Sequence, residues 1–308
     1  MRVLEGDPRE WPEPTGPGTA VTIGNFDGVH LGHQTVLADL AERASALGGL
    51  PRAVLTFDPH PVAVMAPEHA PRLLTSIDQR IEILDYLGVD TVGVLPFERV
   101  RTMNPEQFVG DVLARGLGAR VVAVGSNFRF GHDRVGDVES LRAEGMTFGF
   151  DVDVVPLLEG DGPVSSSGIR TMISTGAVDE ARQALGRAFE LRGEVVGGER
   201  RGRSIGFPTA NVVPPTGMAI PARGVYAARA RIGAHLLPAV VNVGVRPTFS
   251  GEIELIEAHL LDFEGELYGD QIGLLFEHHL RGEQKFEGID GLVAQIERDV
   301  EAARLLLA

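Results

Sequence analysis

Cysteine is absent from all 308 residues of the chain. Disulfide bonds, thiolate metal ligands and cysteine nucleophiles are therefore excluded. Lysine is almost absent too, because Lys285 is the only one. A Walker A loop needs a Gly-Lys-Ser/Thr step, so this way of binding ATP is excluded as well. If the protein handles ATP, we expect glycine-rich loops, histidine, arginine and Mg²⁺ to bind it.

Long hydrophobic runs are missing as well. No apolar stretch approaches the ~18 residues that are needed to span a bilayer, and the N-terminus, MRVLEGDPREWPEP, has no apolar signal core. We therefore expect a cytoplasmic protein that does not bind membranes. The net charge of −15 argues against a broad face for nucleic acid, which is itself a polyanion. Self-association is not readable from the sequence.

Up to Gly186, short apolar runs alternate with helical segments. This alternation predicts an α/β domain with a parallel sheet and helices on both of its faces. One helix start is especially clear, because Asn104 can cap the helix and Pro105 occupies its first position. The expected strands are 20–24, 53–57, 91–95, 121–125 and 152–155. The expected helices are 31–47, 76–87, 104–117 and 137–144.

After Arg187 the pattern changes to runs rich in Val, Ile and Tyr, separated by Gly/Pro turns. It predicts an antiparallel sheet or small barrel, followed by a C-terminal helix over 289–307. The chain is long enough for two domains with cores of their own, and we place them at 1–186 and 187–308. The Gly/Arg/Pro-rich stretch 193–217 is predicted to be a functional loop. The expected strands are 190–196, 224–232, 239–243, 254–261 and 271–276.

The ten residues GNFDGVHLGH, between the first expected strand and the first expected helix, predict a polyphosphate site. Glycines let the main chain approach phosphates closely, and a helix start directs N–H groups at an anion. Two imidazoles can donate hydrogen bonds to an oxygen that is being displaced. The alternative is a plain turn with two solvent-facing histidines. The candidate residues are Gly24, Asn25, Phe26, Asp27, Gly28, His30 and His33.

Three further clusters follow expected strands of the first domain: FDPHP at 57–61, GSNFRFG at 125–131 and SSSGIR at 165–170. Because the carboxyl ends of parallel strands meet at one edge of the sheet, we expect a shared site there. Serine hydroxyls at a helix start and an arginine fork suit phosphate. Each cluster also has a plain interpretation, as a serine cap, a proline turn or a glycine turn. The candidates are Asn127, Ser166, Ser167 and Arg170.

The second domain contains GFPTAN at 206–211, which offers two hard oxygen ligands, Thr209 and Asn211. Both could bind a Mg²⁺ that also holds ATP phosphates. Glu257 lies in an expected strand and could accept a proton from an attacking hydroxyl. A solvated glutamate paired with an arginine is the alternative. The second domain contains two more motifs, NVGVRPTF at 242–249 and LYG at 267–269.

In this order the motifs resemble the bacterial bifunctional riboflavin kinase/FAD synthetase family, from about Val21 to the C-terminus. The resemblance implies a Rossmann-like nucleotidylyltransferase domain that joins FMN to the AMP part of ATP, giving FAD and pyrophosphate. It also implies a C-terminal β-barrel domain that phosphorylates riboflavin with ATP to give FMN. The implied partners are thus riboflavin, FMN, FAD and ATP, with Mg²⁺ as the cofactor.

The resemblance also implies roles for individual residues. His30 and His33 would stabilise the triphosphate as pyrophosphate leaves, and Glu257 would be the general base of the kinase. The implied nucleotide-binding residues are Asn127, Ser166, Ser167, Arg170, Gly206, Pro208, Thr209 and Asn211, the last two also holding Mg²⁺.

Three positions depart from the family pattern. Many relatives have Asp where Asn127 stands, Ser167 replaces Thr, and Gly168 stands where Thr or Arg is frequent. Three alternatives stay open: a riboflavin kinase with weak adenylyl transfer, a flavin-binding protein without turnover, and a different H-x-G-H adenylyltransferase fused to an unrelated β-domain.

Overall fold

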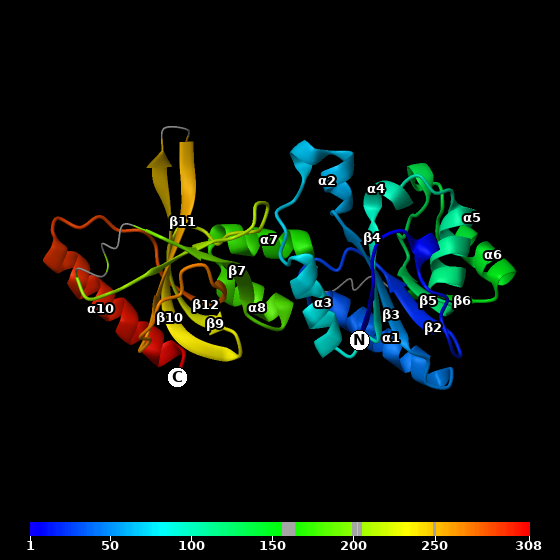
Figure 1. Ribbon diagram of the computed structural model, residues 1–308, viewed down its shortest axis with the longest axis horizontal. Helices are drawn as coiled ribbons and strands as arrows, with labels where there is room; N and C mark the ends of the chain where they lie inside the picture. The colour runs from blue at the N-terminus through cyan, green and yellow to red at the C-terminus, as the bar shows by residue number, and fades with distance from the viewer. Residues whose placement is uncertain (156–163, 199–201, 203–204, 249–250) are drawn as a thin grey trace. The chain divides into compact units, whose positions relative to one another are not determined.

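The computed structural model describes residues 1–155, 164–198, 202, 205–248 and 251–308, and the side chains of 246–253 are outside the description. The chain forms two compact units, each with a core of its own (Figure 1). Unit 1 comprises Met1–Pro71 and Ser76–Val164, and unit 2 comprises Arg72–Thr75 and Ser165–Ala308. The domain boundary that the sequence analysis places after residue 186 stays a prediction.

Unit 1 contains a six-stranded sheet in the order β1-β4-β3-β2-β5-β6, and each of its strand pairs is parallel. The parallel sheet is thus confirmed. The chain adds β3 and β4 on one side of β2 and then β5 and β6 on the other, so the order reverses beside β2. In open α/β sheets ligands bind at such a reversal, outside the carboxyl ends of the strands. The strands are Arg2–Leu4, Thr19–Ile23, Arg52–Asp58, Thr91–Pro96, Ala119–Gly125 and Asp151–Val155.

Helices cover both faces of this sheet, as the βα alternation predicts. Alternate residues of β3 point to opposite faces: Val54 packs with helices α1 and α3, whereas Leu55 packs with η3 and α6. The helices are α1 Leu31–Ala46, α2 Pro61–Met65, α3 Ile77–Tyr86, α4 Phe97–Val100, α5 Pro105–Gln107 and α6 Val138–Phe148. Four short or irregular elements join them, η1 Pro8–Glu10, η2 Pro67–His69, η3 Phe108–Gly116 and η4 His132–Arg134.

The expected helix 104–117 is only partly right. Asn104 caps it in a reciprocal pair with Gln107, and Pro105 is its first residue, as predicted. However, only the first turn is α-helical, and Phe108–Gly116 has the wider π-helical hydrogen bonding. Apolar spacing does not distinguish these two windings over so short a segment.

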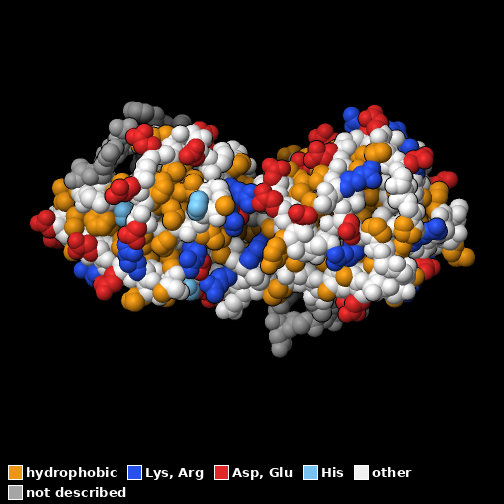
Figure 2. All heavy atoms as spheres, turned by 60° about the horizontal axis from the view of Figure 1, so that its bottom comes forward, with side chains coloured by type: hydrophobic (Ala, Val, Ile, Leu, Met, Phe, Trp, Pro, Cys, Tyr) orange, Lys and Arg blue, Asp and Glu red, His pale blue; other side chains and the backbone are white. Residues whose placement is uncertain are grey.

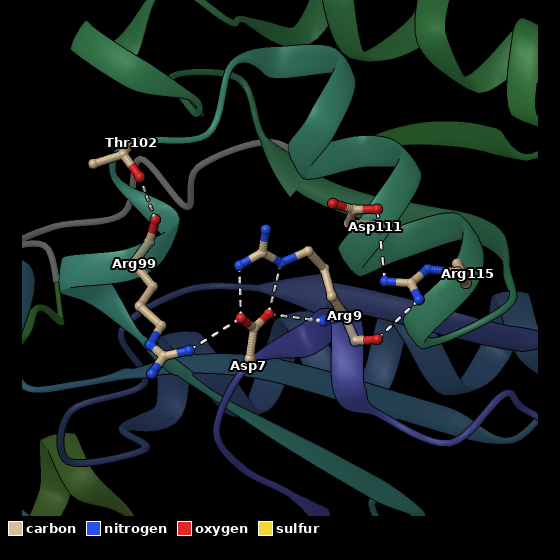
Figure 3. A network of polar contacts seen from close by, with 6 residues as sticks. All are labelled: Asp7, Arg9, Arg99, Thr102, Asp111 and Arg115. Atoms are coloured by element: carbon tan, nitrogen blue, oxygen red, sulfur yellow. Dashed lines mark hydrogen bonds and ion pairs between the residues drawn. The ribbon is translucent and has the colours of Figure 1, made fainter.

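The strand β1 was missed, because it has three residues and only Leu4 of them is buried. A hydrogen-bonded network anchors the segment that follows β1 (Figure 3). The buried carboxylate of Asp7 accepts bonds from Arg9 at 2.7 and 3.0 Å and from Arg99 at 3.0 Å. These bonds, first that from Arg9, hold the pKa of Asp7 far below its usual range. The network therefore stabilises unit 1 above the unfolded pKa near 4 and loses that contribution in strong acid.

Unit 2 contains a closed antiparallel barrel in the strand order β10-β11-β8-β7-β12-β9, which confirms the expected barrel. Strand β8 was missed, since it begins inside the stretch predicted to be a loop. The C-terminal helix α10, Ile289–Leu306, packs on the outside of β9 and β10 through Ala303 and Leu307. The strands are β7 Phe189–Val196, β8 Ala210–Val213, β9 Gly224–Ile232, β10 His235–Thr248, β11 Gly251–Leu260 and β12 Gln271–Arg281.

Two helices that continue the βα pattern of unit 1 in the sequence belong to the core of unit 2. Ile173 of α7 (Ser166–Thr175) and Leu185 of α8 (Val178–Leu185) are buried with barrel residues such as Phe276. Leu74, from the short stretch 72–75, joins the same core. The sequence indicated a helix start at the serine cluster, but it predicted neither α8 nor the unit into which the two helices pack.

In the part of the chain that the structure describes, no helix combines the length and apolarity needed to cross a bilayer. Acidic and basic side chains both occur on each unit in the face that Figure 2 shows.

Candidate active sites

The histidine turn lies between β2 and α1, at the reversal point of the sheet. His30 is the N-cap of α1, and its Nδ1 accepts a hydrogen bond from the backbone N–H of His33 at 3.3 Å. The two imidazoles are stacked, with centroids 3.8 Å apart and planes 15° apart. Because Nδ1 of His30 is an acceptor, the proton of its neutral ring is on Nε2. The structure therefore brings together the two histidines in a defined orientation.

The backbone of this turn is strained at two positions that are not glycine. Phe26 and Val29 have φ angles of 50° and 38°, a region that side chains with a Cβ rarely adopt. Both side chains are buried, which holds the turn in place. Gly32 lets the His30 ring lie close to the backbone, since a Cβ there would lie only 3.1 Å from Cε1 of His30. The predicted residues Gly24, Asn25, Asp27 and Gly28 all belong to the same turn.

His33 is held in its neutral form. Burial, followed by the neighbouring His30 and Arg80, keeps its pKa well below 6.5. Its Nδ1 is buried and has no hydrogen-bond partner among the described residues, so a protonated ring would bury an unsatisfied N–H group. A neutral imidazole can still donate one hydrogen bond, as stabilisation of a leaving pyrophosphate requires.

Arg80 of α3 supports the turn from beneath, and sequence reasoning missed it. Its guanidinium is almost fully buried and lies 3.8 Å from Asp27 Oδ1. Nη1 donates to Thr56 Oγ1 at 2.8 Å and to the carbonyl of Phe57 at 3.3 Å. The signal was available: Ile77, Arg80, Ile81 and Leu84 have the i, i+3, i+4, i+7 spacing of one buried helix face. An arginine at such a position needs a buried partner.

An aromatic cavity of about 340 Å³ lies at the carboxyl end of the sheet, where β3, β4 and β5 end. Phe57 meets Phe97 edge to face at 5.7 Å, and Phe128 stacks on Phe130 at 5.6 Å. Basic side chains also contribute to the lining. Asn127 is exposed in the same loop, beside Phe128. The lining residues that matter here are Phe57, Phe97, Phe108, Phe128, Phe130, Arg101, Arg129, His132 and Arg134.

The serine cluster belongs to unit 2. Ser165 caps α7, because its Oγ accepts the N–H of Gly168 at 3.1 Å, and Ser166 and Ser167 form the first turn. Nε of Arg170 donates to the carbonyl of Arg72 at 2.6 Å. The serine cap is thus present as its plain interpretation says. The phosphate-binding roles of Ser166, Ser167 and Arg170 stay predictions.

The polar site of the barrel is formed by three adjacent strands. In the strand pairing, Glu257 of β11 stands opposite Asn211 of β8 on one side and opposite Asn242 of β10 on the other. Residues that are directly opposite have side chains on the same face of the sheet. Nδ2 of Asn242 lies 3.5 Å from Oε2 of Glu257 and donates to it. A carboxylate thus lies on a rigid strand between two amides, and Asn242 is a neighbour whose role the sequence had not indicated.

The segment before β8 brings its backbone against this polar face. A Cβ at Gly198 would lie 2.1 Å from Nδ2 of Asn211, so a larger residue there would displace the Asn211 side chain. His259 of β11 donates from Nδ1 to the carbonyl of Pro208 at 2.8 Å and thereby holds the GFPTAN segment, in which Gly206 forms a turn. Thr209 lines a second cavity of about 340 Å³ together with Pro208 and the loop 263–268. In NVGVRPTF, Phe249 and the side chains from Arg246 onward lie outside the described residues.

Together with the family models that match its two regions, the parallel sheet and the barrel identify the chain as a flavin-nucleotide transferase. A family model described as FAD synthetase matches residues 13–168, and one described as riboflavin kinase matches residues 185–307. The chain belongs to the family of bifunctional riboflavin kinase/FMN adenylyltransferases.

Two relatives with the family's name match this chain over nearly their whole length. The chain is 41% identical to the protein from Pseudomonas fluorescens over 94% of both chains. It is 39% identical to that from Escherichia coli K12, over 93% of this chain and 92% of the relative. A crystal structure from Streptococcus pneumoniae, described as a macrolide-efflux protein, matches with a TM-score of 0.88 at 30% identity over 99% of both chains. The fold is therefore shared along the full chain.

Proposed function

We propose that the chain carries out both reactions of its family, in separate sites. Unit 2 phosphorylates riboflavin with ATP to give FMN and ADP. The site of unit 1 then transfers AMP from a second ATP to FMN, which gives FAD and pyrophosphate. The observation that carries the proposal is that both family models match one chain, each over a region that contributes its own polar site.

In the kinase step the 5′-hydroxyl oxygen of riboflavin bonds to the γ-phosphorus of ATP, and the bond from that phosphorus to the β–γ bridging oxygen breaks. Glu257 accepts the hydroxyl proton, and Asn242 orients its carboxylate through the bond to Oε2. The side-chain oxygens of Thr209 and Asn211 are hard, neutral donors and fit a Mg²⁺ that shares its other positions with phosphate. When bound there, Mg²⁺ would neutralise charge on the phosphates.

In the adenylyl step a phosphate oxygen of FMN bonds to the α-phosphorus of ATP, and the bond to pyrophosphate breaks. The nucleophile is already an anion and needs no base. The site must instead bring two polyanions together and stabilise the leaving group. The stacked histidines at the start of α1 suit this task, because ring and backbone N–H groups act there together.

We place the flavin ring of FMN in the aromatic cavity of unit 1. Its phenylalanines match a flat, largely apolar ring system, and the basic side chains in its lining match the FMN phosphate. Phe57 belongs to this lining, and its own carbonyl accepts the bond from Arg80 beneath the histidine turn. The cavity and the histidine turn are thus adjacent within unit 1.

Phe128→Ala tests this placement. Loss of one stacking ring costs about 1–3 kcal/mol, so we expect KM for FMN in FAD formation to rise roughly 5- to 150-fold. KM for ATP in the same reaction should not change. Phe148→Ala on α6 is the matched control, because this phenylalanine is partly exposed and is not among the cavity residues. Equal KM values for FMN in wild type and Phe128→Ala would place the ring elsewhere.

The proposed function itself is tested by chromatography of the products from riboflavin, ATP and Mg²⁺. We expect FMN to form first and FAD to follow, with pyrophosphate released in proportion to FAD. Accumulation of FMN without FAD would indicate a single-activity kinase. Binding of flavin without any consumption of ATP would indicate a carrier protein.

A further inference from the structure

We propose that Arg80 is a positioning residue for adenylyl transfer, which joins the histidine turn to the wall of the flavin cavity and places a fixed positive charge beside that turn. This inference rests on the proposed function of unit 1. It goes further because it assigns a role to a residue that lies outside each motif discussed so far.

Hydrogen bonds of Arg80 link the histidine turn, strand β3 and the aromatic cavity. Nη1 of Arg80 donates to Thr56 Oγ1, and the same hydroxyl donates to the carbonyl of Asn25 in the histidine turn at 2.8 Å. Nη1 also donates to the carbonyl of Phe57, whose side chain lines the aromatic cavity. One buried cation therefore connects β3, the turn after β2 and the cavity. Errors of about 1 Å in the position of reacting groups cost on the order of 10²-fold in rate.

The buried guanidinium of Arg80 also brings a positive charge close to the histidine turn. The ion pair of Arg80 with Asp27 is long, at 3.8 Å, and Nε of Arg80 is buried without a hydrogen-bond partner in the described part of the chain. Burial lowers the pKa of Arg80, whereas Asp27 and Asp58 stabilise its charged form. An arginine retains its proton under these conditions. Its charge then disfavours a second cation nearby and favours anions in the site.

The charge of Arg80 affects the protonation of His33. The groups that act on its ring are the stacked imidazole of His30, the ring of Phe26 at 4.8 Å and the charge of Arg80. The start of α1 adds a partial positive charge of its own. His30, Arg80 and the start of α1 thus all oppose protonation of His33 and lower its pKa. The histidine pair therefore works through hydrogen bonds from neutral rings, while Arg80 supplies the permanent charge.

The test compares Arg80→Met, Arg80→Lys and wild type by two measurements. The first is the titration of His33, followed by the NMR shift of its Cε1–H and assigned with His33→Gln. The second is the pH dependence of kcat for FAD formation from supplied FMN. Thermal unfolding followed by circular dichroism reports whether unit 1 remains folded in the variants, and FMN formation in unit 2 is the reference activity. Arg142→Met on α6 is the matched control, since Arg142 is exposed and pairs with its near neighbour Glu139 on the same helix.

In wild type we expect no titration of His33 near pH 6.5. In Arg80→Met it should begin at a higher pH than in wild type, and kcat for FAD should fall on the order of 10²-fold at pH 6 and less at pH 8. Arg80→Lys should keep the wild-type pH profile. If Arg80→Met folds poorly, Arg80→Gln makes the same comparison.

An unchanged kcat for FAD formation in Arg80→Met would overturn the positioning role, and an unchanged His33 titration in that variant would overturn the effect of the Arg80 charge on His33. Failure of the proposed function looks different: wild type itself would form no FAD, while the His33 titration could still be compared.

Discussion

Glu257→Gln should lower FMN formation from riboflavin by about 10²- to 10⁴-fold, the usual contribution of a general base. The substitution keeps the size of the side chain on β11 but removes its ability to accept the hydroxyl proton. Conversion of supplied FMN to FAD should continue at the wild-type rate, because the histidine turn and the aromatic cavity belong to unit 1. Separate assays of the two products measure both effects on one preparation.

Glu254→Gln is the matched control for this experiment. Glu254 lies on the same strand, is exposed and pairs with Arg72 at 3.1 Å, so its loss should leave FMN formation nearly unchanged. If both variants lowered FMN formation equally, the effect would come from β11 as a whole. Equal loss of FMN and FAD formation in Glu257→Gln would contradict the assignment of the two reactions to separate sites.

His30→Ala should give the reverse result, with FMN accumulating and FAD formation reduced by about 10²- to 10³-fold. This substitution also removes the side-chain cap of α1, which costs about 1 kcal/mol of stability. His30→Asn separates the two effects, since asparagine is a good N-cap but lacks the imidazole. We expect both variants to lose FAD formation and only His30→Ala to unfold at a lower temperature.

The control for the histidine variants is His69→Ala, because His69 of η2 is exposed and contacts only its neighbour Glu68 among the bonds described. It should leave both reactions intact. Unchanged FAD output in His30→Asn would remove the His30 ring from the mechanism. Recovery of FAD formation in His30→Asn but not in His30→Ala would mean that capping alone explains the loss.

Much of the architecture was predictable because its signals are local. The change from βα alternation to closely spaced strands near residue 187 correctly predicted a parallel sheet followed by a barrel. The N-cap at Asn104 was equally clear. By contrast, β1 is too short to show a period, and the π-helical winding of 108–116 leaves no mark in apolar spacing.

The residues of the candidate sites also differ in how far the sequence could predict them. The histidine turn is one contiguous segment, so its residues could be found together in the sequence. Arg80 was missed because its partners, Asp27 and Thr56, come from two other elements. The aromatic cavity likewise collects phenylalanines from segments that are far apart in the sequence, from Phe57 of β3 to Phe130 after β5. Asn242 becomes a neighbour of Glu257 only through the register of β10 and β11.

The sequence by itself determined the order of the elements, the two-part organisation and the segments that carry glycine, histidine and hard oxygen donors, since period and composition are properties of contiguous residues. Only the tertiary structure decided which distant groups share a buried charge, where α7 and α8 pack, and which strands stand opposite Glu257. Burial and strand register depend on contacts between segments far apart in the chain. A single sequence, read along its length, contains no direct record of those contacts.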